Sequence, residues 1–443
     1  MKILINMEEY NTCLYSIIGA DFISAQFSCL HISYMCDIYI CCVFNILKGV
    51  IFMERNVGVV VRGIRSPIIK PGDDLVNIVA DSISNAVKSD NIILRDNDVI
   101  GITEAVVAKA QSNFAMLEDI KEDIKSKYNN EIGIVFPILS RNRFSNILKG
   151  IAMGVDKVYI QLSYPGDEVG NRLISQEQLD ETDINPYRDV LTEEEFYSIF
   201  KITKHEYTGV DYIQLYKSIC EGKATIILSN DPKAILKYTK SVLAADIHTR
   251  NRTKRILKEA GAEIVYGLDE IMNKPINNSG YNPDYGLLGS NLSSEDRLKL
   301  FPRECDKFVI NVQKEIEKRF NLKVNVLVYG DGGFKDPTGG IWELADPVVS
   351  PGYTDGLKGV PNEIKLKYIA DTELKGLSKE DAEKEVKNLI NNKPKTNDTF
   401  SSQGTTPRKI VDLLGSLCDL TSGSGDKGTP FILIQGYFDT YAD

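Results

Sequence analysis

Alternating and periodic runs of apolar residues divide most of the chain into short strands and helices. The first segment begins at Val57, where VGVVVRGI is typical of a strand and a loop with two prolines follows. Apolar residues at helical spacing predict a helix over residues 75–87, and a strand over 98–103 leads into a helix that carries Lys109. Apolar and polar residues alternate over 157–162, which predicts another strand. Strands and helices are therefore expected to succeed one another through this part of the chain.

The later part continues with the same kinds of element. Residues 224–247 and 253–267 are predicted to form, in order, a strand, two helices and a strand, which is typical of a small α/β unit. Further along we expect a helix over 307–320, a strand from 326, an exposed helix over 378–391, a short helix over 410–418 and a strand over 431–437.

These elements predict an α+β fold with more than one domain. At 443 residues the chain is too long for one typical core. We expect residues 53–171 and 316–443 to form a core in two parts, interrupted by an α/β insertion over residues 172–315.

Composition sets residues 1–52 apart from the rest. They contain five of the eight cysteines but only two basic residues. This contrast favours Met53 as the physiological start, and a weak membrane span over residues 32–52 is the alternative. The remaining cysteines, Cys220, Cys305 and Cys418, have no metal-ligand spacing, which indicates a reducing, cytoplasmic environment.

The overall charge narrows the class of partner. The formal net charge of −10 argues against a dedicated binder of nucleic acid or of an anionic membrane, although a local basic patch can still hold a phosphate. The charged fraction of 26% and the hydrophobic fraction of 43% are ordinary for a globular protein.

The most informative chemistry lies in the glycine-rich stretch over residues 326–351. Its strand pattern breaks at Gly330, so Asp331 is expected where the strand opens into a loop. Glycines let backbone N–H groups approach an anion, while Asp331 and Asp336 offer the oxygen ligands that Mg²⁺ or Mn²⁺ prefers. A tight hairpin with solvated aspartates would show the same residues.

A second acidic loop follows the strand at 157–162. The segment PGDEVGN places Asp167, Glu168 and Asn171 just beyond the strand end. If Asp167 and Asp331 converge, the two carboxylates can hold one or two divalent cations over a triphosphate. Ordinary turn aspartates are the alternative here too.

Several basic and glycine positions are candidates for binding phosphate. Lys109 follows a strand as phosphate-binding lysines do, and a surface lysine is the alternative. Arg141 and Arg143 are candidates for neutralising a phosphate or a carboxylate, with a surface salt bridge as the alternative. Near the end of the chain, TSGSGDKGTP is predicted either to close over a nucleotide or to act as a flexible linker.

Other polar residues are assigned structural roles. Four basic residues are predicted to form a solvated helix face: Arg250, Arg252, Lys254 and Arg255. His205 and His248 are isolated from other metal-ligand residues, so both are expected to be structural. The absence of a G-x-S-x-G motif or a cysteine–histidine signature predicts no nucleophilic side chain.

Five blocks together resemble the gamma-glutamyl ligases of the deazaflavin coenzyme F-420. They are SPIIKPGDDL at 66–75, DNDVIGITEAVVAKAQ at 96–111, the strand ending in Asp167 and Asn171, VLVYGDGG at 326–333, and GSGDKGTP at 423–430. Their order matches throughout. The resemblance covers residues 53–443 apart from the insertion, and it implies that family's α+β fold, here interrupted by the α/β insertion, and a homodimer.

The resemblance also implies an activity. Members of that family add L-glutamate to a small phosphate-linked carboxylate acceptor with GTP, or here ATP as the alternative, and with Mg²⁺ or Mn²⁺, with K⁺ as a further cation. Since a carboxylate and an amine do not condense in water, such a ligase phosphorylates the acceptor and lets the amine displace phosphate. There are two alternatives to this activity. One is a regulatory protein that binds nucleotide without catalysis, and the other is a ligase for a folate-like acceptor.

The family pattern assigns individual residues. Asp167 and Asp331 match its metal ligands. The nucleotide-binding positions are Ser66, Pro67, Ile68, Ile69, Glu104, Lys109, Asn171, Gly423, Gly425, Asp426 and Gly428. The chain departs from the pattern in two loops: the last one lacks an acidic residue, and Gly332 and Gly333 replace a threonine and an asparagine after Asp331. The first departure removes an acidic ligand of the second metal site, and the second removes a hydroxyl ligand.

Overall fold

The computed structural model describes residues 57–205, 208–330, 333–335, 342–344, 350–393, 408–422 and 425–442, with only the backbone described at 333–335 and 342–344. The chain divides into two compact units, Met1–Val57 and Gly58–Asp443, and the elements given below belong to the second. The predicted start at Met53 and the alternative span over 32–52 lie outside the described residues. Across those described ranges, no helix is long and apolar enough to cross a membrane.

A five-stranded sheet is built from both ends of the second unit. Its order is β1-β16-β2-β12-β15, in which β2 and β12 are parallel and the other pairs are antiparallel. The strands are β1 (Val60–Ile64), β16 (Phe431–Gln435), β2 (Val99–Thr103), β12 (Asn325–Tyr329) and β15 (Gly352–Tyr353). Strand β16, near the end of the described residues, thus lies between β1 and β2.

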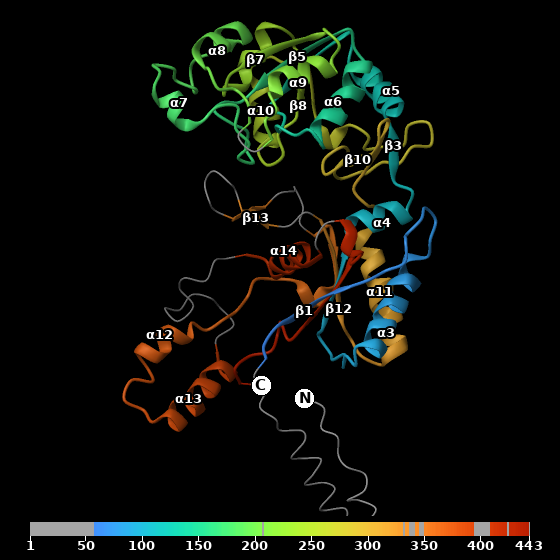
Figure 1. The fold of residues 1–443 in the computed structure, drawn as a ribbon, viewed down its shortest axis with the longest axis vertical. Helices are drawn as coiled ribbons and strands as arrows, with labels where there is room; N and C mark the ends of the chain where they lie inside the picture. The colour runs from blue at the N-terminus through green and yellow to red at the C-terminus, as the bar shows by residue number, and fades with distance from the viewer. Residues whose placement is uncertain are drawn as a thin grey trace, which may run out of the picture. The chain divides into compact units, whose positions relative to one another are not determined.

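Alternating side chains give this sheet two apolar faces. Ile100 and Ile102 face α3 (Leu75–Ser89) and α11 (Cys305–Phe320), which lie against each other (Figure 1). Val99 belongs to the opposite face, which α14 (Ile410–Ser422) covers. A strand buried on both faces needs such apolar residues at every position. The sheet is the core of this part of the chain.

A six-stranded sheet forms the second layered structure. Its order is β6-β7-β5-β4-β8-β9, and all neighbours are parallel except β6 and β7. The strands are β6 (Leu191–Thr192), β7 (Ala224–Leu228), β5 (Lys157–Leu162), β4 (Glu131–Val135), β8 (Ser241–Ala244) and β9 (Ile264–Gly267). One face packs against α5 (Leu117–Lys127), α6 (Phe144–Met153), α8 (Glu193–Ile199) and α9 (Tyr212–Ile219), and the other against η1 (Pro232–Lys237) and α10 (Arg250–Glu259).

Smaller elements complete the described structure. A three-stranded sheet consists of β10 (Asn291–Ser294), β11 (Arg297–Lys299) and β3 (Phe114–Met116), and a hairpin consists of β13 (Gly333–Lys335) and β14 (Trp342–Leu344). The remaining helical segments are α4 (Glu104–Ala110), α7 (Gln176–Asp180), η2 (Leu268–Glu270), η3 (Asp355–Leu357), α12 (Leu366–Asp371), α13 (Lys379–Asn391) and η5 (Gly425–Lys427).

The expected α+β class is confirmed, but the division of the chain differs from the expected one. A boundary between residues 171 and 172 would cut the six-stranded sheet, because β4 and β5 precede it while β7, β8 and β9 follow. The segment 241–244, predicted as part of a helix, is strand β8. Its short apolar run SVLA is buried between β4 and β9, where strand and helix patterns look alike.

The basic residues at the start of α10 are also placed differently from the prediction. Arg250 forms an ion pair with Asp269 at 2.8 Å, and Lys254 pairs with Glu270. Their side chains are only 14% and 16% exposed. The prediction of a solvated face is therefore wrong for these two residues, because acidic residues after β9 pack over the helix.

His205 and the three described cysteines are placed in structural surroundings. His205 Nδ1 accepts a hydrogen bond from Thr208 N at 3.3 Å, and its ring packs edge-on against Tyr212. Cys220, Cys305 and Cys418 are buried free thiols. The expected cytoplasmic location stays a prediction.

Candidate functional site

A cavity of about 340 Å³ lies where β2 and β12 end. These parallel strands pair side by side up to Thr103 and Tyr329, so the segments that follow them start at one edge of the sheet. Four parts of the chain line the cavity: Ser66, Pro67, Ile68 and Ile69; Thr103, Val106 and Lys109; Tyr329; and Ser422, Gly425, Gly428, Thr429 and Pro430. Its volume is in the usual range for a small-molecule site.

Lys109 provides the positive charge of the cavity. It lies in the last turn of α4, the helix that starts directly after β2. Its side chain is exposed and forms no ion pair with any residue in the described ranges. Because the ammonium group is not neutralised by the described protein, it is available to an anionic ligand.

The glycine-containing loop before β16 forms the opposite wall. Gly425 and Gly428 have φ angles of 75° and 63°, a backbone region that favours glycine, and no atom lies within 4 Å of where their Cβ would be. The loop is held at its end next to β16, because Ser66 N donates to Gly428 O at 3.2 Å and Thr103 N donates to Pro430 O at 3.0 Å. A glycine wall with open space beside it allows a ligand to approach the backbone closely.

The exposed apolar residues of the cavity lie in the loop after β1. Ile68 is 83% exposed, whereas the neighbouring Ile69 is 4% exposed. Ile69 therefore anchors the loop in the core, and Ile68 presents an apolar surface to the cavity. Such a surface beside a lysine and free backbone suits a ligand with both an apolar ring and an anionic group.

A model of the F420-0:gamma-glutamyl ligase family matches residues 63–436. The chain belongs to this family. No curated protein matches the chain. The family match includes every segment that lines the cavity.

Most of the nucleotide-binding residues predicted for this ligase family member meet in the cavity. Seven of them line it: Ser66, Pro67, Ile68, Ile69, Lys109, Gly425 and Gly428. Asp426 is exposed in the same loop but does not line the cavity, and Gly423 lies outside the described residues. Thr103, Tyr329, Ser422 and Thr429 were not predicted. Each of them lies at the end of a strand or helix, or beside a predicted residue. That position in the sequence could have identified them as candidates.

Glu104 has a different environment from the one predicted. It starts α4, but it is 5% exposed and pairs with Lys299 of β11 instead of lining the cavity. Lys299 is itself only 12% exposed. Its ion pair with Lys299 therefore fixes the first turn of the helix that carries Lys109.

Asp167 and Asn171 lie in the loop after β5, a strand of the six-stranded sheet. Asp167 Oδ2 accepts hydrogen bonds from Leu139 N at 2.7 Å and Asn171 Nδ2 at 3.1 Å. Its Oδ1 accepts from Asn171 N at 2.8 Å and Val169 N at 3.1 Å. Burial raises the pKa of Asp167 to about 6, against the lowering effect of these donors. Four N–H groups occupy the acceptor positions that a cation would need.

Of the two aspartates predicted to share a metal ion, only Asp167 lies in the described residues. Asp331 and Asp336 lie outside the described residues, so the expected convergence of Asp167 and Asp331 stays a prediction. Within the described part of the chain, no three His, Cys, Asp or Glu side chains gather as a metal site would require. Asp331 follows Tyr329, a residue of the cavity, by two positions.

Proposed function

We propose that this protein is a nucleotide-dependent ligase that forms a gamma-glutamyl amide bond on a small carboxylate acceptor, with the nucleotide bound in the cavity at the ends of β2 and β12. The family supports the ligase reaction. One observation supports the nucleotide: three predicted segments, at 66–69, at Lys109 and at 425–428, line a single cavity although up to 362 positions separate them.

The proposed reaction has two steps. An acceptor carboxylate oxygen attacks the terminal phosphorus of the nucleoside triphosphate, and the bond to the bridging oxygen breaks, which releases the diphosphate. The amino group of L-glutamate then attacks the acyl carbon, loses a proton, and displaces inorganic phosphate. Charge neutralisation and positioning supply most of the catalysis in phosphoryl transfer.

The residues of the cavity have separate tasks in this proposal. Lys109 binds the phosphates, the backbone N–H groups of residues 425–428 cradle them, and Ile68 contacts the base. Asp331, which follows the cavity residue Tyr329 by two positions in the sequence, would hold Mg²⁺ or Mn²⁺, and the ion would supply charge neutralisation for the phosphates. The proposal also includes K⁺ as a further cation and GTP as the favoured nucleotide over ATP. It further includes a homodimer.

Lys109→Ala tests the nucleotide site. Affinity for GTP, or for ATP if that is the substrate, should fall about 10- to 100-fold, because a charge-assisted hydrogen bond contributes about 1.5–3 kcal/mol. Lys88→Ala is the matched control, because Lys88 is exposed on α3 and does not line the cavity. Isothermal titration calorimetry with each nucleotide measures both effects and separates GTP from ATP.

Turnover is measured separately as release of nucleoside diphosphate that depends on both L-glutamate and a carboxylate acceptor. Wild-type protein should release diphosphate with a set of short phosphorylated carboxylates, and Asp331→Asn should lose most of this activity while staying folded. Tight nucleotide binding with no amino-acid-dependent turnover for any acceptor would instead identify a regulatory nucleotide-binding protein. Unchanged affinity in folded Lys109→Ala would reject the cavity as the nucleotide site.

A further inference from the structure

Strand β1 lies at one edge of the five-stranded sheet. It pairs with β16 on one side, and no described strand pairs with it on the other (Figure 1). Alternate residues of an edge strand direct their N–H and C=O groups away from the sheet. The strand covers Val60–Ile64, and five paired residues span about 17 Å. It therefore presents a row of backbone groups long enough to pair with a short extended peptide.

A cavity of about 680 Å³ lies along this edge. Residues 62–65 line it from one side, and Ser82, Asn85, Ala86 and Ser89 of α3 line it from the other. Because successive strand residues point to opposite faces, a cavity that touches four in a row lies along the strand edge. The four α3 residues are three or four positions apart, so they form one face of the helix. We call the space between this face and β1 the edge groove.

The α3 wall of the edge groove offers polar groups and leaves room for a ligand. Its side chains are all short. Neither Ser82 nor Asn85 has a side-chain hydrogen bond to a described residue. A hydroxyl and an amide both donate and accept hydrogen bonds, so they can bind polar groups of a ligand in the groove. The volume of the groove is within the usual range for ligand sites.

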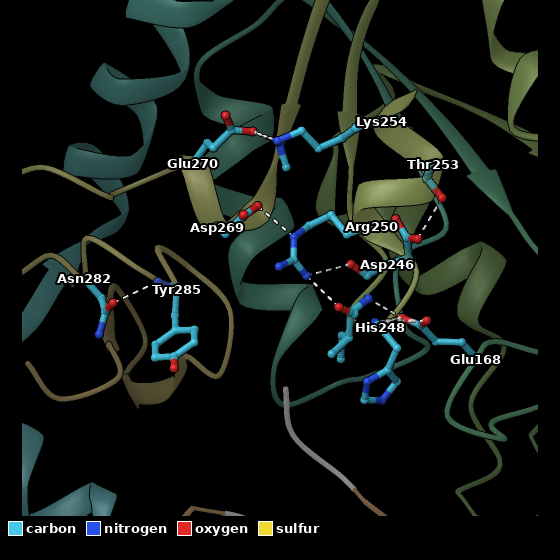
Figure 2. Close-up of polar contacts among 12 residues, drawn as sticks. Glu168, Asp246, His248, Arg250, Thr253, Lys254, Asp269, Glu270, Asn282 and Tyr285 are labelled. Carbon is cyan, nitrogen blue, oxygen red and sulfur yellow. Dashed lines mark hydrogen bonds and ion pairs between the residues drawn. The ribbon is translucent and has the colours of Figure 1, made fainter. Parts of the chain in front are cut away.

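An arginine without a partner lies at one end of the edge groove. Arg65 follows β1 directly, is exposed, and has no hydrogen bond or ion pair with a described residue. It differs in this respect from Arg250 and Lys254, which pair with Asp269 and Glu270 (Figure 2). Its guanidinium is therefore available to a carboxylate, which it matches in geometry.

A second arginine and an aspartate set the polarity of the edge groove. Arg62 Nη1 donates to Gln435 Oε1 at 2.7 Å, which leaves the other N–H donors of its guanidinium for a ligand. Gln435 lies opposite the first residue of β1 and donates from Nε2 to Ile93 O at 3.0 Å, so the segment after α3 reaches the start of the strand. Asp90 lines the groove there, and Arg65 lines the other end. Positive charge therefore gathers toward the end of β1.

We propose that the edge groove binds an extended acidic peptide segment of a partner protein, which adds to β1 as a further strand. The main chain of the peptide pairs with the edge of β1, and an acidic side chain pairs with Arg62 and Arg65. The two arginines outnumber Asp90, so the lining favours an acidic peptide over a basic one. A small anion would leave the strand edge unpaired. The edge groove shares no lining residue with the proposed nucleotide cavity, so it stands independently of the proposed function.

The heptapeptide TVTETVT, with a fluorescein label at its amino end and an amide at its carboxyl end, is the probe. It reads the same in both directions, and its glutamate shares one face with two valines. Fluorescence polarisation against the full chain should show saturable binding with a dissociation constant below about 1 mM. Arg65→Glu should weaken binding at least about tenfold, because an attractive pair becomes repulsive. Arg252→Glu is the matched control, because Arg252 is exposed on α10 and outside the lining, so binding should be unchanged.

Two N-methylated forms of the peptide test the strand pairing. Only alternate N–H groups of an added strand face its neighbour, so methylation of one alternate set should abolish binding and methylation of the other should be tolerated. Asn85→Trp fills the edge groove from α3 and should also abolish binding. Lys88→Trp, at an exposed position of the same helix outside the lining, should bind as wild type does. The lysine peptide TVTKTVT should bind at least about tenfold more weakly than the glutamate peptide.

Four results overturn the proposal. They are absence of saturable binding to wild type, wild-type affinity in Arg65→Glu, equal affinity for the lysine peptide, and tolerance of both methylated sets. A wild-type dimer that Asn85→Trp converts to a monomer in size-exclusion chromatography also overturns it, because a second copy of the chain would then occupy the edge of β1.

Discussion

At the scale of single residues, Asp167 shows how one carboxylate can look like a metal ligand in the sequence and hold a loop in the structure. Its position after a strand, followed by Glu168 and a glycine, is the pattern expected of either role. Three of the four N–H groups around its oxygens belong to Val169 and Asn171 in the same loop, and the fourth belongs to Leu139, which is 28 positions away. Only the folded chain reveals which donors reach the carboxylate.

The raised pKa of Asp167 predicts a particular pH dependence of stability. Burial raises its pKa from the usual 3.8 to about 6, so the folded state holds a proton that the unfolded chain releases first. Stability should therefore fall as pH rises through this interval and stay at the lower level above it. A shift of about two pKa units corresponds to a loss of about 3 kcal/mol.

Urea unfolding of wild type and Asp167→Asn between about pH 4 and about pH 7 measures this effect. The wild-type free energy of unfolding should decline more steeply than that of the variant, in which no proton is exchanged at residue 167. Asp183→Asn, at an exposed carboxylate of the same region, should follow the wild-type slope. Parallel profiles for wild type and Asp167→Asn would show that this carboxylate ionises normally in the folded protein.

At the scale of elements, the packing of α14 on the five-stranded sheet depends on one glycine. A Cβ atom at Gly101, in the central strand β2, would overlap the Sγ of Cys418. Gly101→Ala should therefore lower the free energy of unfolding by about 1–3 kcal/mol through overpacking.

A double-variant cycle identifies the cause of that loss. Gly101→Ala with Cys418→Ala should be more stable than Gly101→Ala alone, because the second change removes the overlapping sulfur. Gly58→Ala, where no atom lies within 4 Å of the new Cβ, should stay within about 0.5 kcal/mol of wild type. Additive effects of the two core changes in chemical denaturation would contradict the proposed contact.

The elements that the sequence predicted correctly are those with a clear period. The helix expected over 75–87 is α3, and the strands expected at 98–103 and 157–162 are β2 and β5. In contrast, SVLA carries no period because parallel strands inside a sheet are apolar on both faces, so β8 was assigned to a helix. The expected boundary of the insertion at residue 172 differs from the structure for a related reason. Which strands share a sheet depends on contacts between distant segments, and the local sequence of each strand does not determine its neighbours.

The cavity was predictable to the extent that its residues lie at strand ends. Lys109 follows β2 and the glycine loop precedes β16, so sequence position made both of them candidates, and the family pattern decided between each candidate and its alternative. Thr103 and Tyr329 were not predicted, because threonine and tyrosine are common in strands without any binding role. Glu104 was assigned to the nucleotide by the family pattern, and nothing in the sequence indicates that it would pair with Lys299, 195 positions later.

At the scale of the whole molecule, the buried pair of Glu104 and Lys299 joins α4 to the three-stranded sheet. The side chains are 7% and 12% exposed. Lys299→Met leaves the buried carboxylate without this lysine, which should cost about 3–5 kcal/mol. Replacing Glu104 by Gln in the same protein should restore much of that stability.

Thermal unfolding at neutral pH checks this prediction. Lys307→Met provides the control, because the Lys307–Glu304 pair is exposed on both sides and exposed pairs contribute little. A melting temperature of Lys299→Met equal to that of Lys307→Met would mean that the buried pair does not stabilise the fold.

The position of β16 has a consequence for synthesis on the ribosome. This strand ends at Gln435 and lies between β1 and β2, so the five-stranded sheet cannot close until residue 435 has been translated. The six-stranded sheet is complete at Gly267. At about 5–20 residues per second, synthesis from Gly267 to Gln435 takes roughly ten to thirty seconds, and for that time the backbone edges of β1 and β2 that face β16 stay unpaired. During that interval every strand of the six-stranded sheet has been made while the five-stranded sheet still lacks β16, and unpaired strand edges of this kind are prone to aggregation.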